Sequence, residues 1–267
     1  MKRMQDSLRI GVIGGGGWLG KALACAILNK GVVDHAGLTL SYRHARPASF
    51  PNVHCTQNNQ ELADRSDVII VSVRPADWPS LSVDAHGKLV ISVMAGIRLD
   101  QLAANHQTGR VVRALPNAAA EVGRSYTPWI ASGDMDEADR SIARRIFRAF
   151  GVEDEVNGES DIDYLTGLSG SGPAFPALFA AAMMKDAVDH GLPTDIARRA
   201  VNTVLIGAGA LLEHQDDCPN NVVNSFLDYR GTTAAAIEAM RAFGLEATVS
   251  EGLSAAFKKS VSMGGAS

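Results

Sequence analysis

The stretch Ile10-Gly-Val-Ile-Gly-Gly-Gly-Gly-Trp-Leu-Gly20 decides how the first half of this 267-residue chain folds. A short apolar run, residues 8–13, leads into four consecutive glycines, and residues 22–28 then have helical character. The glycines contain the spacing G-x-G-x-x-G between a predicted strand and a predicted helix. This arrangement is typical of the turn that binds the pyrophosphate of a dinucleotide.

Each glycine of this turn has its own expected role. Gly15 permits the tight turn, Gly17 lets the backbone approach a pyrophosphate, and Gly20 lets the helix pack close to the strand. The pyrophosphate would lie at the helix N-terminus, where free N–H groups and the helix dipole favour an anion. A second register that uses Gly14 and Gly16 stays open, as does a merely flexible glycine turn. The cofactor contacts expected here are Gly15, Gly17, Trp18, Leu19 and Gly20.

The rest of the first half alternates apolar runs with turn residues. Residues 68–73 are apolar and β-branched, as expected for a strand that is buried on both faces. Further strands are predicted at residues 38–42, 89–93 and 110–114. The pattern predicts an α/β fold, with a Rossmann-type doubly wound parallel sheet in the N-terminal half.

The second half has a different sequence pattern, because strand-like apolar runs disappear after about residue 155. Alanine-rich segments with helical spacing replace them, and an all-helical C-terminal domain is therefore expected. We place the boundary between residues 155 and 156. The predicted helices are residues 173–189, 194–212, 232–243 and 246–262.

Composition excludes several classes of protein. With 46% hydrophobic and 20% charged residues, the chain can bury a sizeable core. Its net charge of −4 gives no indication of a basic surface that would bind nucleic acid or an anionic membrane. The longest nearly uncharged segments, residues 174–184 and 200–212, are too short to span a bilayer. Residues 1–9 contain no apolar core of a secretory signal.

The three cysteines, Cys25, Cys55 and Cys218, fit neither a zinc site nor a disulfide framework. A reducing cytoplasm is the expected location. No group of histidines and carboxylates has metal-ligand spacing, so no metal is expected.

The end of the second predicted strand bears on the cofactor. It continues as Ser41-Tyr-Arg-His-Ala-Arg46, without the acidic residue that would bind the ribose 2′-hydroxyl of NAD. Ser41 and Arg43 suit a 2′-phosphate, because a guanidinium can donate to two phosphate oxygens at once. NADP is therefore the preferred cofactor. A solvated basic loop is the alternative, and NADH use stays open.

Later blocks appear in the order of one known family. They are Asn59, the strand Asp67-Val-Ile-Ile-Val-Ser-Val-Arg-Pro75, the turn at residues 91–97, the block Arg113-Ala-Leu-Pro-Asn117 and the segment Thr166-Gly-Leu-Ser-Gly-Ser-Gly-Pro-Ala-Phe175. From Arg9 to about Lys259 the chain resembles the pyrroline-5-carboxylate reductase family. The resemblance implies NADPH along the C-terminal edge of the sheet and hydride transfer to a cyclic C=N bond. It adds these cofactor contacts: Asn59, Val73, Arg74, Pro75, Ala95, Gly96 and Asn117.

The resemblance also implies a substrate site. Thr233 would stand near the imine nitrogen, where its weakly acidic hydroxyl orients the imine or relays a proton. Backbone N–H groups would hold the substrate carboxylate, and the helical half, residues 156–267, would form a homodimer or larger homo-oligomer. The implied substrate contacts are Ser169, Gly170, Ser171, Gly172, Arg230, Gly231 and Thr232. Local structural roles are the alternative: helix entry for Gly170–Gly172, and helix capping for Thr232 and Thr233.

Two departures leave the substrate open. Ala118-Ala-Ala120 replaces the family's Thr-Pro-Ala, and Asp228-Tyr-Arg230 replaces Ser-Pro-Gly. Arg230 could clamp the carboxylate, require a more acidic substrate, or pair with Asp228 and close the pocket. Pyrroline-5-carboxylate is the preferred substrate. The alternatives are another cyclic imine, a β-hydroxyacid-type dehydrogenase, for which Lys185 is poorly placed, and a homologue that binds NADPH without catalysis.

Overall fold

The computed structural model describes residues 8–215 and 218–264, and these form two compact units. Of these residues, the sheet unit comprises 8–171 and 256–264, and the helical unit comprises 172–215 and 218–255. Residues 1–7, on which the expectation of no signal segment partly rested, lie outside the described part. Within that part, no helix is long and apolar enough to cross a membrane, and no cluster of residues could hold a metal ion.

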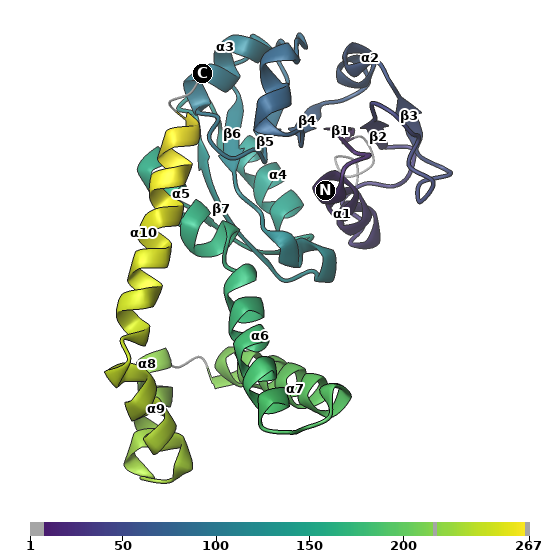
Figure 1. The fold of residues 1–267 in the computed structure, drawn as a ribbon. Coiled ribbons are helices and arrows are strands. Elements are labelled where there is room, and N and C mark those ends of the chain that lie inside the picture. Colours follow the sequence, from purple (N-terminus) through teal and green to yellow (C-terminus); the bar gives the residue numbers. More distant parts are fainter. Residues whose placement is uncertain (1–7, 216–217, 265–267) are drawn as a thin grey trace. The chain divides into compact units, whose positions relative to one another are not determined.

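The sheet unit is built on one eight-stranded sheet with the order β3-β2-β1-β4-β5-β6-β7-β8 (Figure 1). All neighbouring strands are parallel except β6 and β7, which are antiparallel. The strands are β1 Ile10–Ile13, β2 Leu38–Ser41, β3 His54–Thr56, β4 Val68–Val71, β5 Leu89–Ser92, β6 Val111–Ala114, β7 Ser125–Ala131 and β8 Gly151–Glu155.

Hydrophobic side chains cover both faces of this sheet. Along β4, Val68 and Ile70 join one core cluster, whereas Ile69 and Val71 join the other, as strand alternation requires. The helices of this unit are α1 Trp18–Asn29, α2 Asn59–Asp64, α3 Leu99–His106, α4 Glu137–Phe147 and α5 Glu159–Leu165. The first cluster includes α1 and α4, and the second includes α2 and α3. The predicted doubly wound fold is confirmed.

A buried ion-pair network ties α5 to the sheet. The Arg113 side chain on β6 is only 1% exposed, and its Nη2 donates to Asp163 Oδ1 over 2.6 Å. Glu159 pairs with Arg98 and accepts a hydrogen bond from the Leu99 backbone N–H at the start of α3. Residues 156–171 therefore belong to the sheet unit, so its compact boundary lies later than the predicted one.

The helical unit contains no strand within its described residues, as the sequence predicted. Its helices are α6 Ala174–Asp189, α7 Thr194–Gln215, α8 Pro219–Asp228, α9 Thr232–Ala242 and the first part of α10 Leu245–Gly264. Only three of its hydrophobic residues are buried in the described chain: Ala197, Val201 and Ala234. This unit has almost no core of its own.

Candidate active site

The turn after β1 has the close contacts that require glycine. Gly14 has φ +81°, and a Cβ there would lie 2.5 Å from the Ser72 carbonyl oxygen. A Cβ on Gly20 would lie 2.4 Å from the Gly14 carbonyl oxygen, which places α1 directly against the turn. The strained backbone angle therefore belongs to Gly14, the first residue of the alternative register, whereas the close helix contact belongs to Gly20, as expected.

The N-terminus of α1 is open to an anion. Gly17 is its N-cap, no side chain caps the helix, and no acidic residue lies in its first turn. Free N–H groups and the positive end of the helix dipole are thus available for a phosphate. Ser41 is nearly buried, and its hydroxyl accepts a hydrogen bond from the Gly14 N–H over 3.3 Å. Ser41 therefore supports the glycine turn.

A cleft of about 480 Å³ opens beside this helix start. It brings together seven of the expected cofactor residues: Gly17, Trp18, Leu19, Val73, Arg74, Pro75 and Ala95. Gly96 adjoins it, with φ +79° and a would-be Cβ only 3.0 Å from Met263 near the end of α10. Met263 and Met94 also line the cleft and were not among the expected contacts. Met94 lies within the block of residues 91–97, whereas Met263 belongs to no recognisable motif.

Two arginines near the cleft, Arg43 after β2 and Arg74 after β4, share one carboxylate. Arg43 Nη1 lies 3.3 Å from Asp77 Oδ1, and Arg74 Nε lies 3.4 Å from Asp77 Oδ2. Asn59 is the first residue of α2, whereas Asn58 caps the helix by accepting hydrogen bonds from the backbone of Gln60 and Glu61. Arg43 and Asn59 do not line the 480 Å³ cleft itself.

Asn117 connects two of the expected blocks. Its side-chain N–H group donates to the Ser169 carbonyl over 3.0 Å, and its Oδ1 accepts from the Ala119 backbone. Ser169 and Ser171 use their hydroxyls to bond the carbonyls of Leu165 and Thr166. A Cβ on Gly170 would lie 2.9 Å from Leu115. Backbone groups, rather than these two hydroxyls, therefore remain available to a ligand at this turn.

The turn between α8 and α9 carries the other expected substrate residues. Gly231 is the N-cap of α9, and no side chain caps that helix, so the capping interpretation of Thr232 and Thr233 is wrong. Arg230 has φ +52°, a left-handed conformation that glycine adopts more easily. Arg230 is exposed, and no ion pair joins it to Asp228 among the described residues. Gly172 also lies in the helical unit, whereas Ser169, Gly170 and Ser171 lie in the sheet unit.

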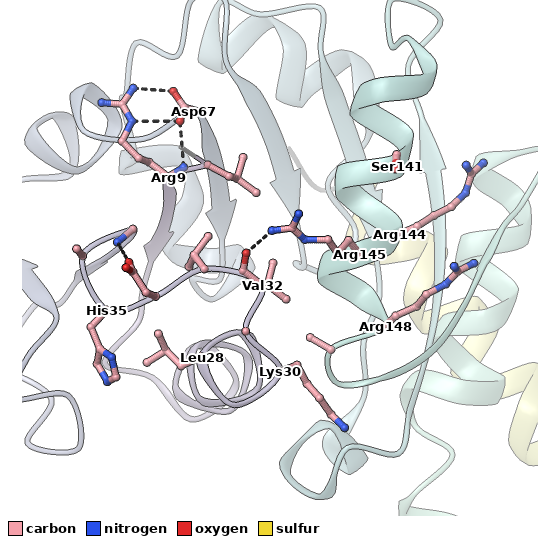
Figure 2. A pocket seen from close by; sticks show the side chains of 17 residues that line it. Arg9, Leu28, Lys30, Val32, His35, Asp67, Ser141, Arg144, Arg145 and Arg148 are labelled. Carbon is pink, nitrogen blue, oxygen red and sulfur yellow. Dashed lines mark hydrogen bonds and ion pairs between the residues drawn. The ribbon is translucent and has the colours of Figure 1, made fainter. Parts of the chain in front are cut away.

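A cavity of about 2050 Å³ lies at the opposite edge of the sheet, where the strands begin (Figure 2). Its cations have structural partners: Arg9 pairs with Asp67, which raises the arginine pKa and lowers that of Asp67, and Arg145 donates to the Val32 carbonyl. Lys30 and Arg148 are the C-caps of α1 and α4, where the helix dipole favours cations. These charges stabilise helix ends and strand starts, so the smaller cleft is the better candidate for the cofactor.

Together, the sheet order, the glycine turn and the uncapped α1 define a dinucleotide-binding oxidoreductase domain followed by a helical domain. Comparison with known proteins agrees with this class. A family model for NADP oxidoreductases, coenzyme F420-dependent, matches residues 9–96, and a model for pyrroline-5-carboxylate reductase dimerisation matches residues 159–263.

The chain belongs to the pyrroline-5-carboxylate reductase family. It is 31% identical over 266 residues to a pyrroline-5-carboxylate reductase of Synechocystis, covering 97% of this chain and 99% of the relative. The pyrroline-5-carboxylate reductase structure from Coxiella burnetii is similar, with a TM-score of 0.86, 25% identity and coverage of 97% and 99%. A pyrroline carboxylate reductase of Plasmodium falciparum, solved with NADP bound, shares the fold with a TM-score of 0.84 at 24% identity, covering 97% and 99%.

Proposed function

We propose that this chain reduces 1-pyrroline-5-carboxylate to L-proline with NADPH. Family membership over nearly the whole chain is the observation that carries the proposal. The glycine turn and the uncapped N-terminus of α1 support it, because they suit a pyrophosphate. When bound, NADPH supplies the hydride that reduces the C=N bond.

The cofactor would be held by the residues that gather on the sheet unit. Backbone N–H groups of Trp18 and Leu19 would bind the pyrophosphate at the start of α1, because the Gly17 N–H already donates to the Gly14 carbonyl. Arg43 would bind the 2′-phosphate, because its guanidinium donates only one hydrogen bond to Asp77 and its other N–H groups can donate to the phosphate. Val73, Pro75 and Ala95 would line the nicotinamide part of the cleft and exclude water from it.

We assign substrate binding to the start of α9. Its uncapped N–H groups would hold the substrate carboxylate, as an anion is favoured at a helix N-terminus. Among the described residues no hydrogen bond involves the Thr233 hydroxyl, so it is available to donate to the imine nitrogen. Because a threonine hydroxyl is a weak acid, it would orient the imine and relay a proton from water.

The variant Thr233→Ala tests this assignment. We expect kcat to fall about 10² fold, the usual range for a lost proton-transfer group, with the Kd of NADPH unchanged. Thr233→Ser, which keeps the hydroxyl, should retain most of the activity. Full activity in Thr233→Ala would contradict the role given to this residue.

The substrate range depends on Arg230, which replaces a glycine of the family motif. A side chain is kept at Arg230 although its backbone angle favours glycine, and no carboxylate pairs with it among the described residues. Another cyclic imino acid is therefore the second candidate substrate. Steady-state assays with pyrroline-5-carboxylate, and with the five- and six-membered 2-carboxylate imines, separate these candidates. No turnover with any of them, despite NADPH binding, would favour a non-catalytic homologue.

A β-hydroxyacid-type dehydrogenase is not supported by the one candidate lysine. Lys185 lies on α6, is largely exposed and pairs with Asp189 one helical turn away. This geometry is that of a solvated surface pair, not of a catalytic base.

We propose that the chain acts as a homodimer or larger homo-oligomer that assembles through its helical half. The match to a dimerisation model over residues 159–263 and the exposed apolar side chains of α6 and α7 support this. A cytoplasmic location is proposed because no disulfide joins the three cysteines. Size-exclusion chromatography with light scattering would test the assembly.

A further inference from the structure

One carboxylate joins Arg74, which lines the cofactor cleft, to Arg43, which does not. Asp77 pairs through Oδ1 with Arg43, on the loop that follows β2, and through Oδ2 with Arg74, on the loop that follows β4. The Asp77 side chain is 27% exposed, whereas those of Arg43 and Arg74 are 58% and 85% exposed. The bridge is therefore accessible to a ligand that reaches either arginine.

The backbone around the bridge is held independently of this carboxylate. The Asp77 N–H donates to the Arg74 carbonyl, and the Ser80 hydroxyl donates to the Asp77 carbonyl. Gln57 donates to the Arg43 carbonyl over 3.1 Å. Both loops should therefore keep their shape when the charge of Asp77 is removed.

We propose that Asp77 is a specificity-determining residue that acts as an internal counter-ion. It competes with the 2′-phosphate of NADPH for Arg43 and Arg74, and it thereby lowers the preference for NADPH over NADH. This inference rests on the proposed binding of NADP. It assigns a role to a carboxylate that belongs to none of the sequence motifs.

The sign of the effect follows from the charges. Two guanidinium groups and one carboxylate leave a net charge of about +1, and removal of the carboxylate raises it to about +2. A 2′-phosphate would gain attraction from this change, whereas NADH carries no such phosphate and leaves the bridge intact. Because all three side chains are partly exposed, solvent and salt screen the interaction and the effect is modest.

Isothermal titration of the full-length protein with NADPH and with NADH tests the proposal without an activity readout. For Asp77→Asn we expect NADPH to bind about 2–5 fold more tightly, in line with the size of exposed ion pairs, and NADH to bind as before. Asp64→Asn is the matched control, because Asp64 is an exposed carboxylate of the same unit that contacts the Gln60 side chain. It should leave the ratio of the two affinities unchanged.

The double variant Arg43→Gln/Asp77→Asn completes the test. The gain from Asp77→Asn should shrink when Arg43 is already absent, because one of the two competing contacts is gone. Weaker NADPH binding in Asp77→Asn, an equal change for both cofactors, or an undiminished gain in the Arg43→Gln background would overturn the inference alone. Absence of NADPH binding by the unaltered chain would overturn the proposed function, and this inference with it.

Discussion

The sheet unit and the helical unit bury their hydrophobic side chains to very different extents. In the sheet unit, all residues of β1, β2, β4, β5 and β6 are buried, and two core clusters flank the sheet. In the helical unit, α6 and α8 have no buried residue, and Leu178 and Ile206 are each 73% exposed. The helical unit thus has the apolar side chains of a core without the core itself.

This difference indicates which unit can fold alone. Burial of apolar area provides most of the stabilising free energy, so the sheet unit is self-sufficient and the helical unit requires another apolar surface. A second copy of the chain would supply one. The match of residues 159–263 to a dimerisation family model agrees with this interpretation.

Charges placed on the helical unit should give the largest effect. We expect Leu178→Glu/Ile206→Glu to convert the oligomer into species of lower mass, because a carboxylate buried in an apolar interface costs several kcal/mol. Light scattering coupled to size exclusion measures the mass, and circular dichroism checks that the helices remain.

Val122→Glu is the matched control for that variant. Val122 is also 73% exposed, but it lies in the sheet unit, which has two core clusters of its own. The mass of the assembly formed by the Val122→Glu variant should equal that of the unaltered protein. If both variants keep the original mass, the helical unit is not completed through these faces.

A comparison of two ion pairs should give the next largest effect. Asp163→Ala leaves the buried Arg113 without its closest carboxylate, and we expect a loss of about 3–5 kcal/mol in the free energy of unfolding. Asp189→Ala breaks the exposed Lys185 pair on α6 and should cost less than about 1 kcal/mol. Chemical denaturation measures the free energy of unfolding of both variants. Equal losses would contradict the prediction that the buried ion pair of the sheet unit stabilises the protein more than the exposed pair on α6.

The glycine turn should affect cofactor binding more than stability. Gly20→Ala places a methyl group against the Gly14 carbonyl, so α1 must move away from the turn, and we expect NADPH to bind at least about 10-fold more weakly. Gly133→Ala, where a Cβ meets open space, is the control. Fluorescence titration with NADPH measures both variants, and unchanged binding in Gly20→Ala would contradict the position given to the pyrophosphate.

The smallest expected effect is the response of the sheet unit to pH. Burial lowers the pKa of His106, whose Nδ1 bonds the Val83 carbonyl while its Nε2 is buried without a partner. The unfolded chain therefore binds a proton more readily than the folded chain. Stability should be full above the unfolded pKa of about 6.5 and should fall as the pH drops from there through the lowered folded value.

His106→Asn should remove this dependence of stability on pH, because the asparagine amide can still donate to the Val83 carbonyl but does not titrate. His86→Asn, at an exposed position, should leave the slope as it is. Thermal unfolding between about pH 7 and pH 5 is the measurement. An unchanged slope in His106→Asn would assign the pH response to other groups.

The sequence predicted the buried strands well and the edge strands poorly. The runs around β1, β2, β4, β5 and β6 were recognised because strands buried on both faces are continuously apolar. The short edge strand β3 and the acidic edge strand β8, Gly-Val-Glu-Asp-Glu, lack that signal, and β7 contains Pro128. These strands depend on pairing with a neighbour, which a local pattern does not contain.

The site was predictable where a local motif carries it. Gly17 and Gly20 lie where the motif requires, and Arg74 and Ala95 reach the same cleft from different strands. The glycine of the turn with a left-handed backbone is Gly14, the first residue of the register that the sequence left open beside that of Gly15. Met263 and Asp77 were missed because their roles come from the folding of distant or unremarkable segments.

The consumption of NADPH with 1-pyrroline-5-carboxylate as substrate tests the central claim most directly. The loss of NADPH absorbance should proceed in step with the formation of L-proline, at one equivalent each, and should stop when the imine is omitted. If the protein binds NADPH yet leaves pyrroline-5-carboxylate unreduced, the proposed reaction is wrong.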